Sequence, residues 1–253
     1  MAQRLAMVTA AAGGIGRAVT QQLLARNVSV VAVDIDQTAL DRLGNEVNSA
    51  ALRLVQGDMT SADDVERVFD MAAGLGDLHV LVNGVGSQCG SSLLDLTPST
   101  WQRMFELNLS SVFLATRAAL PSLKRATGDR VVVNISSTLA AVADPTTLAY
   151  GAFKAGLEQF TRSLALELAP DGIRALAVAP GPVTATAGEA AYDSPEFTRL
   201  NPLGRFATAE EIGEIIAFLA SPAAAYMTGV VVRVDGGDSA LGVGWGPLQT
   251  LLK

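Results

Sequence analysis

The chain has 253 residues, 49% of them hydrophobic, and a formal net charge of -7. This length suits a single α/β sheet enzyme, and the acidic balance argues against nucleic acid or an anionic membrane surface as a partner. Because Cys89 is the one cysteine and His79 the one histidine, an intrachain disulfide and a Cys/His metal cluster are both excluded, and we expect no metal site.

The start of the chain resembles an export signal only superficially. An apolar run from Leu5 to Ala12 follows Arg4, but it is short and leads directly into a glycine turn and an amphipathic helix. Nothing in the sequence approaches 18 uninterrupted apolar residues, as a membrane-spanning helix requires. We therefore expect a cytoplasmic protein in a reducing setting, which the cysteine content also fits.

Strand-like and helix-like segments alternate from the first residues onward. In the first half, strands are expected at 4–9, 29–34, 52–56 and 79–83, and helices at 15–26, 38–47 and 61–73. The alternation is typical of a parallel sheet covered by helices on both faces. With no shift of composition to mark a linker, we predict one α/β domain over residues 1–253, a Rossmann-like, doubly wound fold.

The second half continues the pattern with two less regular segments. Helices are expected at 98–124, from 150 to the breaker residues 170–172, and at 209–220; strands are expected at 130–135, 174–179 and 230–234. Residues 181–201 lack a clean period and suggest a mobile flap beside the site. The apolar tail within 238–253 is expected to pack at a subunit contact near an active site or on its own subunit.

A glycine-rich turn links the first strand to its helix. In Thr9–Gly16, glycines allow backbone amides to approach a pyrophosphate at the positive end of a helix, although a tight βα turn alone needs the same residues. Asp34 ends the second strand, where a carboxylate can accept hydrogen bonds from an adenosine ribose or simply face solvent. Neither Gly13 nor the positions just after Asp34 carry Lys or Arg, which favours NAD over NADP.

Hydroxyls follow the apolar strand Arg130–Ile135 and precede a helix that carries Tyr150 and Lys154. The four-residue spacing puts the phenol and the ammonium on one helix face. A neighbouring buried cation would favour the phenolate, and Ser137 could hydrogen-bond the same substrate oxygen. These groups suit alcohol/ketone chemistry, whereas a surface Tyr-Lys pair beside a serine-rich turn is the plainer interpretation.

Together these motifs resemble those of the short-chain dehydrogenase/reductase family over residues 3 to 237. They occur in the family's order: the glycine turn, Asn83-Gly84-Val85-Gly86, Asn108, Ser137, Tyr150, Lys154, Pro180-Gly181 and Val234-Asp235-Gly236-Gly237. The resemblance implies an NAD-dependent oxidoreductase that interconverts a secondary alcohol or diol and a ketone, with Tyr150 as general acid/base. It also implies a homo-oligomer, a tetramer, for which the apolar segments Ile212–Ala220 and Val230–Val234 are candidate contacts.

The resemblance assigns roles to individual residues. On the adenosine side of the cofactor, Gly14, Ile15 and Gly16 would hold the phosphates, Asp34 would hold the adenosine ribose, and Asp58 and Met59 would contact the adenine. On the nicotinamide side, Tyr150 and Lys154 would hold the ribose, and Pro180, Gly181 and Val183 would line the nicotinamide pocket. Asn83 would hold the end of the fourth strand. The catalytic set would be Asn108, Ser137, Tyr150 and Lys154. Asn108 would hold a water in a proton relay beyond the lysine, although a mid-helix asparagine can also bond locally.

Three positions depart from the family pattern. Ala10 replaces the first turn glycine, so we expect a backbone conformation there that alanine tolerates. Gly84 replaces an asparagine that ties the fourth strand to its neighbours. Ala185 replaces a threonine, leaving Thr184 or Thr186 for the carboxamide contact.

Two other functions stay open. A 3-oxoacyl thioester reductase shares this scaffold; its usual NADPH and acidic carrier protein fit poorly with Asp34 and the net charge, but Arg125, Arg130 and Arg174 keep it possible. A nucleotide-sensing regulator that kept the fold would have no need of the three groups Ser137, Tyr150 and Lys154.

The residues expected to face the substrate are small, apolar or hydroxylated. They are Ser87 to Cys89, Thr138, Leu139, Val142, Pro182 to Thr186 and Tyr192. Because none is Lys or Arg, a neutral secondary alcohol or diol fits better than an anion, whose unpaired charge is costly to bury. Arg199 or Arg205 could overturn this expectation by closing over the site as an anion clamp.

Overall fold

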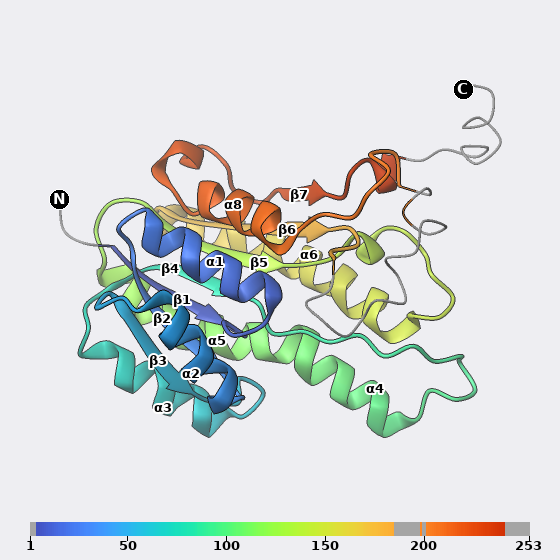
Figure 1. Ribbon diagram of the computed structural model, residues 1–253, viewed down its shortest axis with the longest axis horizontal. Coiled ribbons are helices and arrows are strands. Elements are labelled where there is room, and N and C mark those ends of the chain that lie inside the picture. Colours follow the sequence, from blue (N-terminus) through green and yellow to red (C-terminus); the bar gives the residue numbers. More distant parts are fainter. Residues whose placement is uncertain (1–3, 185–197, 199–200, 241–253) are drawn as a thin grey trace.

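The computed structural model describes residues 4–184, 198 and 201–240. Within them, one parallel sheet has the strand order β3-β2-β1-β4-β5-β6-β7 (Figure 1). The strands are β1 Leu5–Thr9, β2 Ser29–Asp34, β3 Leu52–Gln56, β4 Leu78–Asn83, β5 Arg130–Ile135, β6 Ile173–Pro180 and β7 Val231–Val234. The chain builds outward from β1 to β3 and then crosses to β4 on the other side of β1, which confirms the doubly wound prediction.

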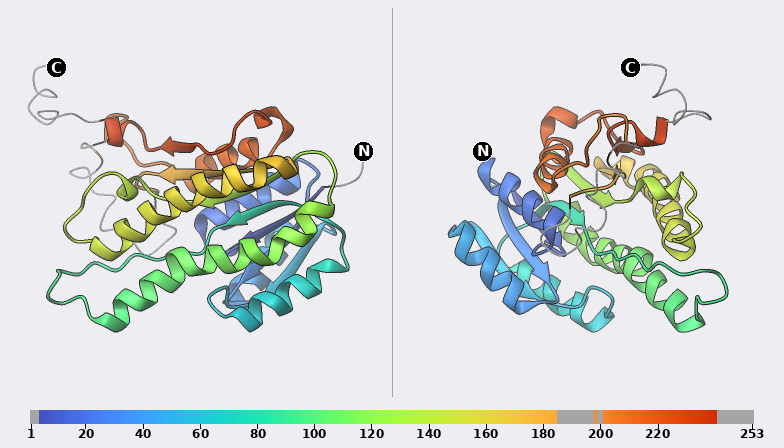
Figure 2. Two further views of the ribbon diagram at one scale, coloured as in Figure 1. Left: turned by 180° about the vertical axis from the view of Figure 1, so that it is seen from behind. Right: turned by 45° about the vertical axis from the view of Figure 1, so that its right-hand side comes forward.

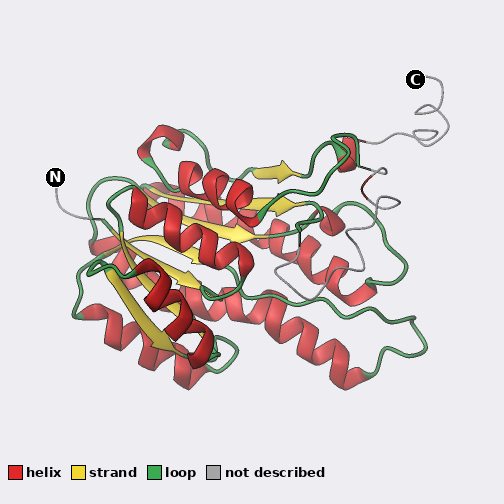
Figure 3. Ribbon diagram, viewed as in Figure 1, coloured by secondary structure: helices red, strands yellow, loops and turns green. Residues whose placement is uncertain are grey.

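Helices cover both faces of this sheet (Figures 2 and 3). They are α1 Gly14–Ala25, α2 Gln37–Val47, α3 Ala62–Ala73, α4 Pro98–Phe105, α5 Ser111–Arg125, α6 Leu148–Leu168 and α8 Ala209–Leu219, with a π-helical turn at Glu106–Ser110. Short 3-10 turns lie at Thr138–Ala140, Ala169–Asp171, Pro222–Ala224 and Asp238–Ala240. The α1, α2 and α8 helices pack on one face, and α3, α5 and α6 pack on the other.

The strands are short apolar runs because the sheet is buried on both faces. In β2, Val30 and Ala32 face the core under α1 and α8, whereas Val31 and Val33 face the core on the other side, as the two-residue period of a strand requires. Every expected strand is present, with ends that agree to within one residue. Among the described helices, none is long and apolar enough to cross a membrane.

Two expectations about helices need refinement. The long helix expected over 98–124 is interrupted by the π-helical turn between α4 and α5, and the helix that carries Tyr150 already begins at Leu148. Most of the expected flap, 185–197 and 199–200, and the tail 241–253 lie outside the described residues.

The amino ends of β5 and β6 hold a buried cluster of charges. Arg174 donates hydrogen bonds to both carboxylate oxygens of Asp129, at 2.8 and 2.9 Å. It also donates to the backbone carbonyls of Leu219, Ser221 and Met227. Arg4 donates to Asp129 as well and to the carbonyl of Ala220. Arg174, one of three arginines that kept the thioester reductase possible, is buried and holds the end of α8 to the sheet, so its guanidinium does not face a partner.

Candidate functional site

The candidate residues gather at the opposite edge, where β1, β4, β5 and β6 have their carboxyl ends. Parallel strands bring these ends together, and ligands of such folds bind beside the crossover point of the strand order. Among the described residues, no group of His, Cys, Asp and Glu has the arrangement of a metal site.

The amino end of α1 is left open for an anion. Its N-cap, Gly13, supplies no side-chain hydrogen bond, whereas α2, α3, α4 and α8 are capped by Asp36, Ser61, Thr97 and Thr208. The first-turn amides, including those of Gly14, Ile15 and Gly16, therefore keep their capacity to bind phosphate oxygens. A Cβ on Gly16 would lie 2.0 Å from the Ala10 carbonyl oxygen, so this close turn requires glycine at that position.

The backbone conformation at Ala10 differs from the one expected. Its φ is +52°, in the left-handed region that L-residues enter at a cost of about 1 kcal/mol or more, so the turn does not suit alanine. The surrounding contacts hold the conformation: the amide of Gly13 donates to the Ala10 carbonyl, and the amide of Ala11 donates to Val33 on β2. The family's glycine is missing here, but the geometry that glycine would favour is retained.

Asp34 organises the same turn from β2. Its carboxylate accepts hydrogen bonds from the Ala12 amide at 3.0 Å and the Asp36 amide at 3.1 Å, one on each oxygen. Each carboxylate oxygen has a further lone pair, so a ribose diol could bind to an acid that is already fixed in place. Exposed Ile35 and the acidic Asp36 follow, and neither could neutralise a 2′-phosphate.

Asp58 and Met59, expected at the adenine, are fixed by local contacts. The Asp58 carboxylate accepts hydrogen bonds from the amide and hydroxyl of Thr60, and its own amide donates to Asp64. The Met59 side chain is buried in the core with Val33, so any adenine contact at residue 59 falls to its backbone.

Asn83, at the end of β4, points into the protein. Its Nδ2 donates to Oδ1 of Asn134 on β5 at 2.8 Å, and its own Oδ1 is buried without a partner among the described residues. The neighbouring Gly84 donates its amide to the Thr9 hydroxyl on β1, and a Cβ at Gly84 would come within 2.5 Å of the Thr9 carbonyl oxygen. Thr9 and Asn83 thus supply the strand ties that the missing asparagine was expected to make.

Ser137, Tyr150 and Lys154 meet at the carboxyl end of β5. Ser137 is near enough to the Tyr150 phenol to lower its pKa, and its hydroxyl accepts a hydrogen bond from the Leu139 amide at 3.2 Å. The ammonium of buried Lys154 donates to the Ile135 carbonyl at 2.8 Å and lies 5.6 Å from the centre of the Tyr150 ring. The interpretation as a surface Tyr-Lys pair is wrong, since both the lysine and the serine are buried.

The protonation of this group differs from expectation. Burial raises the pKa of the Tyr150 phenol, and the hydrogen bond with Ser137 opposes the shift without overcoming it. Burial also lowers the pKa of Lys154 to about 8. Burial therefore leaves the pKa of Tyr150 above its ordinary value, where a lowered pKa was expected beside Lys154, and the phenol holds its proton at neutral pH.

Asn108 occupies the middle of the π-helical turn, a feature that often marks functional positions. Its amide group donates to the carbonyls of Ser87 and Met104, and its Oδ1 accepts from the Ser87 amide. It therefore makes both a local bond and a bond across to the loop after β4. Oδ1 of Asn108 and Nζ of Lys154 each lie 3.0 Å from where a Cβ on Gly86 would sit, so at most twice that distance, about 6 Å, separates them. One water can bridge such a span.

The expected nicotinamide side is built on the end of β6. The Gly181 amide donates to the Val234 carbonyl, and a Cβ on Gly181 would lie 2.9 Å from Asp235, so the two segments require glycine where they touch. Val183 pairs with Ala207 through an isolated bridge, which positions the backbone after Pro180. Three other residues expected near the substrate or nicotinamide, Ala185, Thr186 and Tyr192, lie outside the described residues, as does Arg199.

Arg205, offered as part of an anion clamp, is engaged elsewhere. Its guanidinium binds both carboxylate oxygens of Glu211 at 2.7 and 2.6 Å, beside the capping box of α8. The hydrogen bonds from Arg205 hold the pKa of Glu211 down to about 2, so the pair stays charged over the working pH range.

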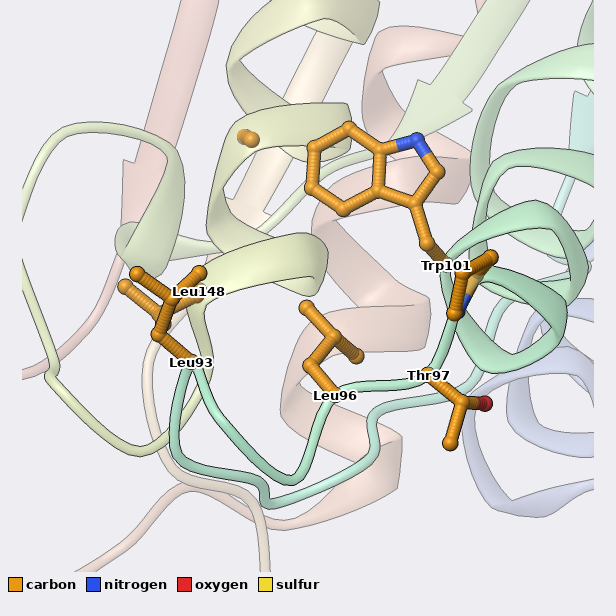
Figure 4. Close-up of a pocket in the computed structure, with 7 residues that line it drawn as sticks. Leu93, Leu96, Thr97, Trp101 and Leu148 are labelled. Atoms are coloured by element: carbon orange, nitrogen blue, oxygen red, sulfur yellow. The ribbon is translucent and has the colours of Figure 1, made fainter.

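An apolar groove of about 580 Å³ lies between α6 and the segment that leads into α4 (Figure 4). It is lined by Leu93, Leu96, Thr97, Pro98, Trp101, Leu148 and Ala152. On α6, Leu148 and Ala152 each stand two residues from Tyr150, which places them about 200° around the helix. The groove therefore belongs to the outer face between α4 and α6 rather than to the candidate catalytic group.

One polar residue at the site escaped the sequence analysis. Glu158 is buried on α6 one turn beyond Lys154, and its carboxylate accepts a hydrogen bond from Ser136. Its position four residues after Lys154, on the same helix face, is the feature of the sequence that could have identified it.

Comparisons with known proteins agree with this geometry. A family model described as enoyl-(acyl carrier protein) reductase matches residues 10–239. A cis-4-hydroxycyclohexanecarboxylate dehydrogenase of Sinomonas cyclohexanicum is 39% identical, over 95% of this chain and 98% of that protein.

Two similar solved structures contain nicotinamide cofactors. A 3-ketoacyl-(acyl-carrier-protein) reductase of Brucella melitensis, complexed with NADH, has a TM-score of 0.86 at 29% identity and covers 93% of this chain and 98% of its own. A Pseudomonas aeruginosa RhlG complex with NADP has a TM-score of 0.88 at 30% identity, with coverages of 94% and 97%. The chain therefore belongs to the short-chain dehydrogenase/reductase family of oxidoreductases.

Proposed function

We propose that this chain is an NAD-dependent oxidoreductase that interconverts a secondary alcohol, or a diol, and a ketone. The observation that carries the proposal is the meeting of Ser137, Tyr150 and Lys154 at the end of β5, with the ammonium fixed by the Ile135 carbonyl. A nucleotide-sensing regulator has no physical need for these three groups in contact, so it remains the weaker candidate.

The chain's own groups provide the proton chemistry. A bound nicotinamide would supply the hydride acceptor or donor. Ser137 and Tyr150 would bind the substrate oxygen, and Tyr150 would donate its proton to a ketone or take one from an alcohol. Lys154 would hold positive charge beside the phenol, and a water between Lys154 and Asn108 would carry the proton outward.

The residues present fit a dinucleotide. The open amides of Gly14, Ile15 and Gly16 suit the pyrophosphate, Asp34 the adenosine ribose, and the segment Pro180, Gly181 and Val183 the nicotinamide. We propose NAD rather than NADP, because the Asp34 carboxylate would repel a 2′-phosphate. Comparable catalytic efficiency with NADP in the unmodified protein would refute that choice.

The substrate class is tested with a panel of secondary alcohols and diols, measured as NAD⁺ reduction. Similarity to the hydroxycyclohexanecarboxylate dehydrogenase makes 4-hydroxycyclohexanecarboxylate and neutral cyclohexanol an informative pair. We expect the neutral alcohol to react, because Thr138 and Leu139 offer no charge to a carboxylate and Arg205 is bound to Glu211. If only carboxylated alcohols reacted, and this activity were lost in Arg199→Ala, Arg199 would be the residue that determines substrate specificity.

A 3-oxoacyl thioester reductase is the second candidate, supported by similarity to the Brucella melitensis enzyme. Of the three arginines that kept it open, Arg174 is buried against Asp129 and Arg125 is paired with Asp77. Faster reduction of a 3-oxoacyl thioester with NADPH than of any simple ketone with NADH would favour this second candidate.

We also propose a cytoplasmic homotetramer with a small-molecule substrate and with neither nucleic acid nor membrane as a partner. The edge strand β7 and the exposed Phe218, Tyr226 and Val230 offer an apolar contact beside α8. Ile212 and Ile216, by contrast, are buried within the subunit. Light scattering that shows only a 26.1 kDa species would refute the assembly.

A further inference from the structure

Three consecutive residues at the end of β5 each hydrogen-bond to α6. The Asn134 side chain donates to the Thr161 hydroxyl at 2.9 Å, the Ile135 carbonyl accepts from Lys154, and the Ser136 hydroxyl donates to Glu158 at 3.2 Å. The next residue, Ser137, acts through its side chain to lower the pKa of the Tyr150 phenol. Ile135 and Ser137 thus act on the candidate catalytic groups, whereas the bond at Ser136 lies between them and has no assigned role.

Glu158 is an unusual residue for this place. Its side chain is only 5% exposed, although a buried carboxylate is costly unless it is bound. One oxygen accepts from the Ser136 hydroxyl, and the other pairs with Arg162 at 3.2 Å. The guanidinium of Arg162 is partly exposed to solvent. The deeper contact of the buried Glu158 carboxylate is therefore Ser136, the residue beside Ser137.

The backbone at Ser136 is held from two sides. Its amide donates to the Val178 carbonyl of β6 at 2.7 Å, and its hydroxyl donates to Glu158 on α6. The residues on either side of Ser136 supply the Ile135 carbonyl that binds Lys154 and the Ser137 hydroxyl that lowers the pKa of Tyr150. Any rotation about Ser136 therefore changes the distances among Ser137, Tyr150 and Lys154.

We propose that Glu158 is a positioning residue, which fixes Ser136 and thereby sets the alignment of Ser137 and Lys154 with the Tyr150 phenol. The proposal rests on the function proposed above. Glu158 touches no reacting atom in this arrangement and acts through the hydrogen bond from Ser136. A misplacement of about 1 Å in such a group can cost about 100-fold in rate, so the loss of one hydrogen bond here should be visible in turnover.

The test compares Glu158→Ala with Glu158→Gln. Glutamine removes the charge but keeps an oxygen that accepts from Ser136, whereas alanine removes both. We expect Glu158→Ala to lower kcat about 10- to 100-fold with KM for NAD⁺ changed less than about threefold, and Glu158→Gln to stay within about threefold of the parent kcat. Glu167→Ala, on an exposed turn of the same helix, is the matched control and should leave kcat unchanged.

The partner variant Ser136→Ala removes the same bond without opening a large cavity. Its kcat should fall like that of Glu158→Ala, and the double variant should be no slower than either single one, because both changes break one interaction. Additive losses, or full activity in a folded Ser136→Ala protein, would overturn the proposal even if Glu158→Ala fails to fold.

A substrate-independent measurement separates this proposal from the proposed function. Ultraviolet titration of the tyrosines, with Tyr150→Phe as the blank, should place the apparent pKa of Tyr150 higher in Glu158→Ala than in Glu158→Gln, because a displaced Ser137 no longer stabilises the phenolate. Equal pKa values would contradict the positioning role. Normal turnover by Tyr150→Phe would refute the proposed function. The titration would still test whether Glu158 positions Ser137, because it requires no substrate.

Discussion

At the amino ends of β5 and β6, Arg174 donates hydrogen bonds to Asp129 and to three backbone carbonyls. At the carboxyl ends of the same strands, Lys154 donates a hydrogen bond to the Ile135 carbonyl. Both cations are buried. The first is neutralised by a carboxylate, and burial lowers the pKa of the second to about 8.

This difference separates a structural charge from one suited to chemistry. The buried Arg174 guanidinium binds Asp129 and three backbone carbonyls, so it holds α8 to the sheet. The Lys154 ammonium donates to one carbonyl, lies beside the Tyr150 phenol and keeps further N–H donors for a ligand, as the proposed function requires. We therefore expect changes at the amino edge to alter stability and changes at the carboxyl edge to alter rate.

The largest expected effect is on turnover. Tyr150→Phe deletes one hydroxyl from the proton path, so we expect kcat to fall about 100- to 10,000-fold while the Kd for NADH, from fluorescence titration, changes little. Turnover like that of the parent would remove Tyr150 from its assigned role.

At the other edge, the effect should be on folding. Asp129→Ala leaves Arg174 and Arg4 without their carboxylate, and we expect a loss of about 3–5 kcal/mol in the free energy of unfolding, measured with urea. Asp77→Ala breaks the exposed pair with Arg125 and should cost under about 1 kcal/mol. A similar cost for both variants would contradict the structural assignment of Asp129.

The buried ammonium should appear in the pH dependence of stability. The pKa of Lys154 is about 8 in the folded chain, against an ordinary value of 10.5. The buried charge therefore destabilises the folded state by its full amount below pH 8, and this destabilisation decreases as the pH rises toward 10.5. The unfolding free energy of the parent, relative to Lys154→Met, should therefore rise by up to about 3 kcal/mol between pH 7.5 and 10.5.

The smallest effect concerns the turn before α1. Ala10→Gly should stabilise the fold by about 1 kcal/mol, because glycine adopts the φ of +52° without strain. Ala12→Gly, in the same turn but without a positive φ, should be destabilising. Thermal unfolding of both variants measures the difference, and stabilisation by the second would show that strain at Ala10 is not the cause.

Much of this arrangement could be predicted from the sequence. Runs such as Val131-Val132-Val133 locate buried strands, and the four-residue spacing of Tyr150 and Lys154 places both on one helix face. These signals are local in the chain, which is why the strand ends agree with expectation and why Tyr150 and Lys154 lie on one helix.

The features that sequence analysis missed depend on contacts between distant segments. Ala10 adopts a left-handed conformation because β2 and the following turn hold it there. The partner of Arg174 lies 45 residues away at Asp129, and Ser136 lies 22 residues from Glu158. The pKa of Tyr150 depends on burial by the whole fold, which sequence spacing does not reveal.

The most direct test of the proposed chemistry is the pH dependence of both directions of one reaction, NAD⁺ reduction by a secondary alcohol and NADH oxidation by its ketone. Because burial raises the pKa of Tyr150, the phenol should hold its proton at neutral pH, so alcohol oxidation should speed up with rising pH while ketone reduction slows down. Rates in both directions that do not change between pH 6 and 10, or the same profile in Tyr150→Phe, would contradict proton transfer through Tyr150.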